Sequence, residues 1–265
     1  MKLYYPDPGM TLHGENACKF LGFEKYDPLT DMDQPAMFWL YFPEDYEYLL
    51  AHKGPRYVYW HGADVLRLLG MQELWPYLLS LRHDIIHACH NHILSEQLAQ
   101  IGIYALIRPV FWNDVSKYPD CCEWSPTPEV YITAHPGREI EYGEGYMIAL
   151  SKVFPELRFH IYGIDGEESD NLIYHGSIPE AVMDSEIKDM QICLRMKKHD
   201  GFSQTAMKAL LFGHYLITGI KYKGIPYAEN FEELVQIISE YTKQYFRNCD
   251  YVYWRKEFNN FDWIK

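Results

Sequence analysis

The alternation of short apolar runs with amphipathic segments constrains this chain more than any other feature. Runs rich in β-branched and aromatic residues predict strands at 56–60, 84–89, 104–110, 128–134, 157–164, 190–196 and 214–219. Amphipathic segments among them predict helices at 15–23, 44–54, 93–102, 144–154 and 203–213. Strands that alternate with helices of this length are most simply connected as parallel βαβ units. The sequence therefore predicts the α/β fold class.

A break in this alternation predicts two domains. Residues 109–128 crowd several prolines around the adjacent Cys121 and Cys122, a composition typical of a connection between domains. We predict an N-terminal domain over 1–112 and a C-terminal domain over 128–248, the latter ending in an amphipathic helix over 231–248. The aromatic tail, 249–265, is expected to pack back on the N-terminal domain.

Charge and cysteine content narrow the classes of function. With 24 Lys and Arg against 37 Asp and Glu, the net charge of −13 disfavours binding to nucleic acid. No apolar run approaches the about 20 residues that span a bilayer, and the N-terminus lacks the apolar core of a signal peptide. We therefore expect a cytoplasmic protein whose cysteines are reduced structural thiols.

Two loops that follow predicted strands are candidates for binding an anion. In RMKKHDGFSQTAMKALLFG (195–213), a loop with Gly201 leads into a helix that Ser203 or Thr205 can cap. A phosphate at this helix start would be held by Arg195, Lys197 or Lys198. The second loop, HPGRE (135–139), offers Arg138 in the same setting. The alternative for both loops is an ordinary strand-to-helix turn with solvated cations.

These loops resemble those of the family 4 (group 1) glycosyltransferases, which have the two-domain GT-B fold. The C-terminal half is similar to the nucleotide-sugar-binding domain of that family over residues 128–230. The similarity rests on HPGRE, LRFHIYGIDG (157–166), YHGSIPE (174–180) and RMKKHDGFSQTAMKALLFGHYLITG (195–219). The N-terminal half is more loosely similar, through HGENACKFLGF (13–23) and YVYWHGADVLRLL (57–69). The resemblance implies two Rossmann-like domains with parallel sheets that face each other across a cleft.

The resemblance also implies site residues. Asp200 corresponds to the first acid of the family's Glu-x7-Glu motif, and His61 and Asp64 are expected near the reacting carbon or the acceptor. We take these three as the candidate catalytic residues. The candidate residues for binding the donor sugar nucleotide are Gly14, Gly137, Arg138, Arg195, Lys198, His199, Gly201, Phe202, Ser203, Gln204, Thr205 and Lys208.

Three departures from the family pattern affect this prediction. Lys208 stands where the family has a second Glu that grips the donor ribose, and a lysine cannot accept hydrogen bonds. Lys208→Glu tests this departure: improved binding of a uridine or guanosine donor would mean that the lysine marks lost or altered specificity. The lysine that usually follows the Gly-Arg loop is absent, and only Tyr142 or Glu144 stands nearby. The first domain is also short, which leaves acceptor binding open.

A histidine-rich segment, HDIIHACHNH (83–92), raises a zinc hypothesis. Read as a strand, it places His87 and Cys89 on one face and His90 on the other, so zinc would need ligands from elsewhere. We favour a sheet edge whose polar end, His90 and Asn91, lines the cleft. The DMD at 31–33 is read as a solvated loop, so we predict no metal site and no cofactor besides the donor substrate.

The predicted function is transfer of a sugar from a nucleotide-diphosphate sugar to a glycan, lipid-linked or other hydroxyl acceptor. We expect it to be independent of metal, and the resemblance implies retention of anomeric configuration. The alternative is a non-catalytic GT-B-like protein that binds a nucleotide or glycan. A nucleic-acid-modifying glucosyltransferase is disfavoured by the charge. Peripheral membrane contact and the oligomeric state stay open.

Overall fold

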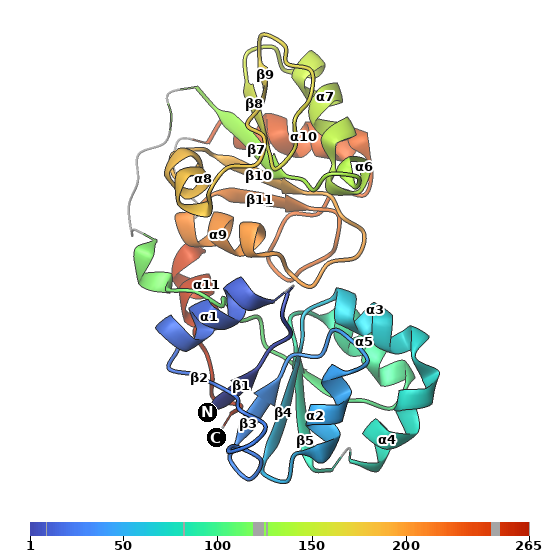
Figure 1. Ribbon diagram of the computed structural model, residues 1–265. Helices are drawn as coiled ribbons and strands as arrows, with labels where there is room; N and C mark the ends of the chain where they lie inside the picture. Colours follow the sequence, from blue (N-terminus) through green and yellow to red (C-terminus); the bar gives the residue numbers. More distant parts are fainter. Residues whose placement is uncertain (9, 82, 119–124, 126, 245–249, 265) are drawn as a thin grey trace. The chain divides into compact units, whose positions relative to one another are not determined.

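The computed structural model describes residues 1–8, 10–81, 83–118, 125, 127–244 and 250–264. It divides into two compact units, each built around one parallel β-sheet (Figure 1). The first unit comprises Met1–Lys117, Asp200–Phe202 and Lys256–Lys265. The second comprises Tyr118–His199 and Ser203–Arg255. Two parallel sheets flanked by helices confirm the predicted α/β class.

The sheet of the first unit has the strand order β2-β1-β3-β4-β5-β6, and all neighbouring strands are parallel. The longest pairing, between β4 and β5, runs from Arg56↔Ile85 to Trp60↔Cys89. The carboxyl ends of the strands therefore share one edge of the sheet. The strands are β1 (Lys2–Tyr4), β2 (Glu24–Lys25), β3 (Ala36–Phe38), β4 (Arg56–Trp60), β5 (Ile85–Cys89) and β6 (Ala105–Ile107).

Helices cover both faces of this sheet. One face carries α2 (Asp45–Ala51), α3 (Ala63–Gly70), α4 (Trp75–Ser80) and α5 (His92–Gln100), with short 3₁₀ turns at Gln72–Leu74 and Val115–Lys117 elsewhere in the unit (Figure 1). The other face carries α1 (Thr11–Phe20) and the C-terminal residues. Its core includes Tyr59, Ala88 and Trp263. Apolar side chains on both faces explain why the central strands read as continuous apolar runs.

The C-terminal tail belongs to the first unit from Lys256 onward. It begins with α11 (Tyr251–Phe258), whose last residue is fully buried. The Trp263 ring lies 6.3 Å from that of Tyr57 and 5.8 Å from that of Tyr59. Aromatic side chains of the tail thus complete the core of the first unit.

The second unit has the strand order β11-β10-β7-β8-β9, again with parallel neighbours. Its helices α7 and α10 bury Met147, Leu150, Leu234 and Ile238 in one core, and α8 and α9 lie over the other face (Figure 1). The strands are β7 (Glu129–Thr133), β8 (Arg158–Tyr162), β9 (Leu172–Tyr174), β10 (Ile192–Arg195) and β11 (Tyr215–Thr218). The helices are α6 (Glu139–Tyr142), α7 (Glu144–Val153), α8 (Glu180–Ile187), α9 (Gln204–Phe212) and α10 (Phe231–Tyr241).

One helix boundary, the state of the cysteines and the length of the helices bear on the predictions from the sequence. The helix predicted over 231–248 ends at Tyr241 as α10. Cys18, Cys89 and Cys193 are free thiols, while Cys121, Cys122 and Cys249 lie outside the described residues. In the described part of the chain, no helix has the length and apolar character needed to cross a bilayer.

Candidate functional site

Three cations of the second unit converge on one tyrosine ring beside the carboxyl ends of β7 and β10. The cationic groups of Arg138, Arg195 and Lys197 lie 5.4, 4.7 and 4.4 Å from the centroid of the Tyr142 ring. The Glu141 carboxylate accepts two hydrogen bonds from Arg138, at 2.8 and 2.6 Å, and lies 2.9 Å from Lys197 Nζ. The group carries three positive charges and one negative charge.

Arg138, Arg195 and Lys197 form what we call the cation cluster. Burial of two of its members strengthens their attraction for an anion. Arg195 is 9% and Lys197 7% exposed, whereas the Arg138 side chain is 53% exposed. The hydrogen bond from Lys197, and next that from Arg138, holds the pKa of Glu141 below its usual value. Buried lysine and arginine side chains usually have a paired anion, and Glu141 is one such partner of Lys197. A polyanion such as a diphosphate fits a group with excess positive charge.

The start of α9 lies near the same strand ends. Ser203 is the N-cap residue, because its hydroxyl accepts a hydrogen bond of 3.1 Å from the Ala206 amide. Thr205 Oγ1 lies 3.0 Å from Thr133 Oγ1 and ties the first helical turn to the end of β7. Gln204 Nε2 lies 3.8 Å from the Met207 sulfur. The remaining amides of this turn are of the kind that binds anions.

The residues between β10 and α9 are not equivalent. Lys198 is exposed and His199 half-buried, whereas Lys197 is buried in the cation cluster. The sequence did not distinguish Lys197 from Lys198. In the structure, Lys197 is the lysine whose ammonium group lies with Arg138 over the Tyr142 ring. In the other loop, Gly137 has a φ of +78° with open space beside its Cα, so the turn itself requires glycine.

The structure corrects the expectation for Lys208. Its ammonium group donates to Glu180 Oε1 and, at 2.6 Å, to Asp184 Oδ1, both on α8. Lys208 is 2% exposed, so it joins α9 to α8 as a buried ion pair. The two acids keep 38% and 28% of their side chains exposed. The ammonium group of Lys208 is therefore engaged by α8, and it does not serve as a donor-binding group in this structure.

The segment Asp200–Phe202 groups with the first unit. Asn91 Nδ2 donates a 2.7 Å hydrogen bond to the Asp200 carbonyl, and Asp200 Oδ1 accepts one of 3.0 Å from the Gly201 amide. A Cβ on Gly201 would lie 1.2 Å from the His61 carbonyl oxygen, so no other residue fits here. Phe202 has a φ of +87°, which is rare for a residue with a side chain. Such conformations persist where the surroundings enforce them, often at functional sites.

Asp64 has a different role from the one its type suggests. Its carboxylate accepts hydrogen bonds from the amides of His61, Gly62 and Val65 at 2.8, 2.6 and 2.9 Å. Burial raises its pKa to about 6 although these amides act in the opposite direction. Asp64 therefore positions the turn that carries His61. It is a positioning residue, because its oxygens are occupied by the backbone of that turn.

The His61 side chain lies in an aromatic group at the carboxyl ends of the strands. Its ring is 4.7 Å from Trp39, 5.1 Å from Tyr59, 5.4 Å from His90 and 5.9 Å from Trp112. Burial, with the nearby His90, lowers the pKa of His61 well below its usual value. Within the described part of the chain, three buried nitrogens have no hydrogen-bond partner: His61 Nε2, Trp39 Nε1 and Trp112 Nε1. Such groups are costly unless a ligand or water satisfies them.

His90 adds a second imidazole to this group. The Tyr59 hydroxyl donates its single hydrogen to the Arg108 carbonyl at 2.5 Å and accepts from the Val110 amide at 3.1 Å. His90 Nδ1, 2.9 Å from that hydroxyl, is therefore the donor, which leaves Nε2 as a hydrogen-bond acceptor. Burial lowers the pKa of His90 to about 3, although Asp200 raises it.

Gly14, a candidate for binding the donor, is part of a helix. It lies in the first half of α1, and a Cβ there would come within 2.3 Å of the Tyr5 ring. Its glycine is thus explained by the close packing of α1 against Tyr5. The structure gives no reason to retain Gly14 among the ligand-binding residues.

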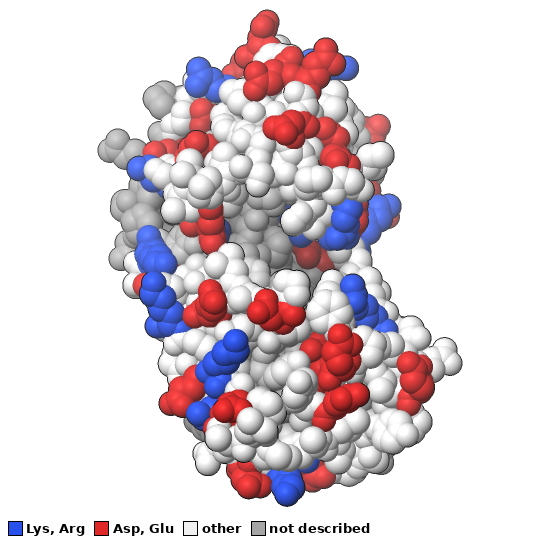
Figure 2. Space-filling view, viewed as in Figure 1, with Lys and Arg blue, Asp and Glu red and all other residues white. Residues whose placement is uncertain are grey.

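The list of site residues selected from the sequence did not include Lys197 or His90. Lys197 was named only as an alternative to Arg195 or Lys198, and His90 only as a residue that lines the cleft. Lys197 stands in the pair KK, and only the twist of the chain after β10 decides which lysine is buried. His90 carried a usable signal, since it directly follows a predicted strand. The zinc hypothesis finds no support within the described residues, where no three His, Cys, Asp or Glu side chains come together as metal ligands. Acidic side chains are spread over the visible surface of both units (Figure 2).

Comparison with solved structures identifies the fold. TarM of S. aureus, solved with fondaparinux, α-GlcNAc-glycerol and UDP, matches with a TM-score of 0.61 and 12% identity over 87% of this chain and 53% of its own. HepE of Anabaena, solved with UDP, matches with a TM-score of 0.63 and 13% identity over 87% of this chain and 76% of its own. A glycosylation-associated Gap123 complex of Streptococcus agalactiae gives 0.54 and 13% over 98% and 57%.

These matches show that the chain has the GT-B fold of glycosyltransferases. The chain spans about half the length of the TarM structures that it matches. No protein-family model matches the sequence, and no curated protein is significantly similar to it.

Proposed function

We propose that this chain transfers a sugar from a nucleoside-diphosphate sugar to a hydroxyl group of an acceptor, as predicted from the resemblance to family 4 glycosyltransferases. The observation that carries the proposal is the convergence of Arg138, Arg195 and Lys197 on the Tyr142 ring. Three cations beside the start of α9 suit a leaving group that gains negative charge in the reaction. UDP is the nucleotide bound in the TarM and HepE structures, and it is our first choice for the donor nucleotide.

Each cation has a role in this proposal. Arg195 and Lys197, which are buried, hold the diphosphate, and the exposed Arg138 closes on it from the loop before α6. Lys197 takes the place of the lysine that the Gly-Arg loop lacks. Glu141, which now pairs with Arg138 and Lys197, competes with the diphosphate for both cations.

The reaction forms one bond and breaks another. The acceptor oxygen bonds to the anomeric carbon, the bond from that carbon to the diphosphate oxygen breaks, and the acceptor proton passes to the departing phosphate. Fixed cations can stabilise the leaving diphosphate, which supports a reaction independent of metal. Retention of configuration remains part of the proposal through the family resemblance.

We assign the acceptor hydroxyl to the group His61, His90 and Asp200 in the first unit. The unpartnered Nε2 of His61 and the acceptor Nε2 of His90 give this group hydrogen-bonding capacity for a polyol. Glycan and lipid-linked acceptors both present such hydroxyls. The aromatic rings of Trp39 and Trp112 offer apolar surface to the sugar face.

A second candidate is a protein that binds the nucleotide or glycan without turnover. The observation that favours it is Lys208, whose buried ion pair with Glu180 and Asp184 replaces the glutamate of the family pattern. Consumption of the donor separates the two candidates. A protein that binds UDP but leaves every UDP-sugar intact would be the second.

The donor site is tested by isothermal titration with UDP, GDP and ADP. Loss of a charged hydrogen bond in Lys197→Gln should weaken nucleotide binding about 10- to 100-fold. Lys152→Gln, which changes an exposed lysine of α7, is the matched control and should bind as the native chain does. Equal affinity in the native chain and in Lys197→Gln would remove the cation cluster from the nucleotide site.

A further inference from the structure

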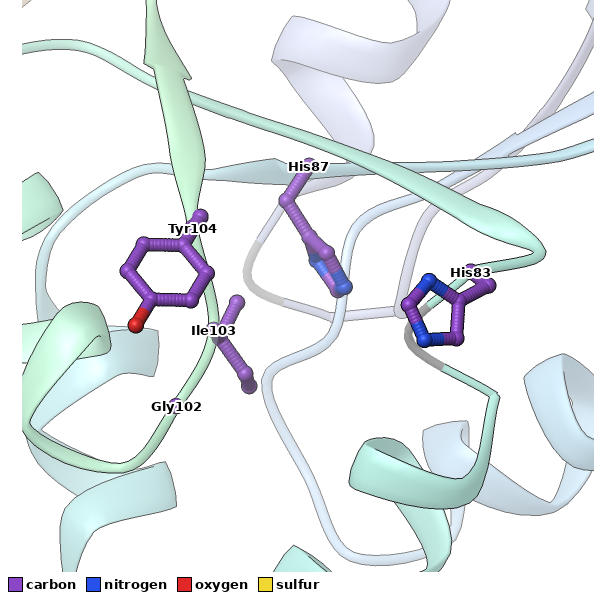
Figure 3. Close-up of a pocket in the computed structure, with 5 residues that line it drawn as sticks. All are labelled: His83, His87, Gly102, Ile103 and Tyr104. Carbon is purple, nitrogen blue, oxygen red and sulfur yellow. The ribbon is translucent and has the colours of Figure 1, made fainter.

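A cavity of the first unit lies away from the groups described so far. It has a volume of about 370 Å³ and is lined by His83, His87, Gly102, Ile103 and Tyr104 (Figure 3). These residues belong to β5 and to the segments that precede β5 and β6. His61 and His90, by contrast, follow the carboxyl ends of β4 and β5. The volume is within the range of about 300–1,000 Å³ typical of small-molecule sites.

His87 gives this cavity an unsatisfied hydrogen-bond donor. The side chain is 4% exposed, and its Nδ1 accepts a hydrogen bond of 3.2 Å from Trp60 Nε1. An accepting nitrogen carries no hydrogen, so the ring hydrogen of neutral His87 is on Nε2. Burial lowers the pKa of His87 to about 4, which keeps the ring neutral near pH 7. Nε2 has no hydrogen-bond partner among the residues that the structure describes.

The other lining groups define the ligand class. Ile103 is 1% exposed and offers aliphatic surface, and Tyr104 is 81% exposed and offers an aromatic ring beside the cavity (Figure 3). Figure 3 shows the His87 and His83 rings turned toward each other across the site. The described residues that line the cavity contribute no carboxylate, ammonium or guanidinium group. The chemistry suits an uncharged ligand with oxygen acceptors and an apolar face.

We propose that this cavity is a second carbohydrate site that binds a neutral monosaccharide unit, with His87 Nε2 donating to a sugar oxygen and the Tyr104 ring packing on the sugar face. Its residues are separate from the donor and acceptor groups, so it would hold a glycan without transferring to it. Zinc is a poorer occupant, because a zinc site needs more ligands than two imidazoles and the described residues bring no third ligand together.

The test is a titration monitored by NMR of the histidine ring nitrogens. The probes are methyl α-glucoside, methyl β-galactoside and N-acetylglucosamine, each added without nucleotide. We expect a saturable shift of the His87 Nε2 signal with at least one probe. Tyr104→Ala should weaken that binding about 2- to 10-fold through loss of ring contact. Tyr77→Ala, at a 59% exposed tyrosine of α4 outside the cavity lining, should not.

His87→Phe should abolish sugar binding, measured by isothermal titration because this variant lacks the reporting ring. Tyr104→Ala keeps the test valid if loss of the hydrogen bond from Trp60 unfolds the His87→Phe variant. No saturable shift with any of the three sugars would overturn the proposal. An unchanged affinity in Tyr104→Ala would overturn it too, as would ring shifts produced only by Zn²⁺. Sugar binding at the acceptor group would leave the His87 signal and the Tyr104 dependence unaffected.

Discussion

Gly201 shows how closely a single residue can be specified by its neighbours. Adding a Cβ would place it 1.2 Å from the His61 carbonyl oxygen, so Gly201→Ala must shift the Asp200–Phe202 segment or the turn after β4. We expect a loss of about 1–3 kcal/mol in the free energy of unfolding, as for overpacked sites. Urea denaturation measures it.

Gly145→Ala is the control for this change. Gly145 lies in α7 with nothing within 4 Å of an added Cβ. Alanine there should be neutral or stabilise by up to about 1 kcal/mol. If Gly201→Ala were as stable as Gly145→Ala, the close approach to His61 would not exist in solution.

Glu141 contacts two members of the cation cluster, Arg138 and Lys197, so its removal should increase the affinity for anions. Glu141→Gln frees Arg138 and Lys197 from a carboxylate that they now share. The pairs are partly exposed, which limits the gain in UDP affinity to about 2- to 5-fold. Isothermal titration measures it, and Glu240→Gln on α10 is the control. Weaker UDP binding in Glu141→Gln would show that the carboxylate supports the site instead of competing.

The sequence identified cations that do come together in the structure, but it did not show which selected residues have a structural function instead of binding a ligand. Arg138 and Arg195 were selected from their places after strands, and they do meet at one ring. Asp64 and Gly14 were selected from the family resemblance, and the structure places one in a turn and the other in a helix contact. The sequence shows which residues stand near a strand end. It does not show which backbone amides or rings their side chains reach first.

The contact between α8 and α9 depends on Lys208. Lys208→Met leaves the carboxylates of Glu180 and Asp184 without their cation, and we expect a loss of about 1–3 kcal/mol because both acids keep some solvent. A double-mutant cycle with Asp184→Asn measures the pairwise energy. Additive losses in the cycle would mean that the ion pair contributes nothing.

Lys208→Glu should not improve nucleotide binding, because Lys208 is held in its ion pair with Glu180 and Asp184. It would gather three carboxylates between α8 and α9 and destabilise the contact. The same titration with UDP tests it. Tighter UDP binding by a folded Lys208→Glu variant would return position 208 to the ribose site.

Most strands found from the sequence have four or five residues, and β6, with three, is the exception among them. Strands β4, β5, β7 and β8, of five residues each, lie within predicted ranges. The missed strands β1, β2, β3 and β9 have two or three residues. A run that short shows no alternation, and its strand form comes from pairing with neighbours. Whether so short a segment becomes a strand depends on its tertiary contacts, and the local sequence does not show these.

For the whole molecule, buried neutral histidines predict a loss of stability on acidification. Burial lowers the pKa of His87 and His160 to about 4 and that of His90 to about 3. Unfolding returns each to about 6.5, so the unfolded chain binds more protons and stability falls as the pH drops from 7 toward 4. Asp64, with its pKa raised to about 6, acts in the opposite direction over part of this window.

Three histidines against one carboxyl group give a slope of about 2–3 kcal/mol per pH unit near pH 5.5. His52 and His61, whose pKa values burial also lowers, steepen it. Urea denaturation at several values between pH 5 and 7 measures the slope. A stability independent of pH across that range would show that these imidazoles are hydrated in the folded protein.

The first unit draws on three separate stretches of sequence, and this has a consequence for biosynthesis. Phe258 is fully buried there, and its carbonyl accepts a hydrogen bond of 3.2 Å from the Phe111 amide. While the ribosome is still making the second unit, the nascent first unit lacks both this partner and Trp263. Its aromatic core stays incomplete until the last of these residues emerges from the ribosome. The unit translated first therefore exposes apolar surface for the longest time, and a chaperone that binds such surface can bind it throughout that time.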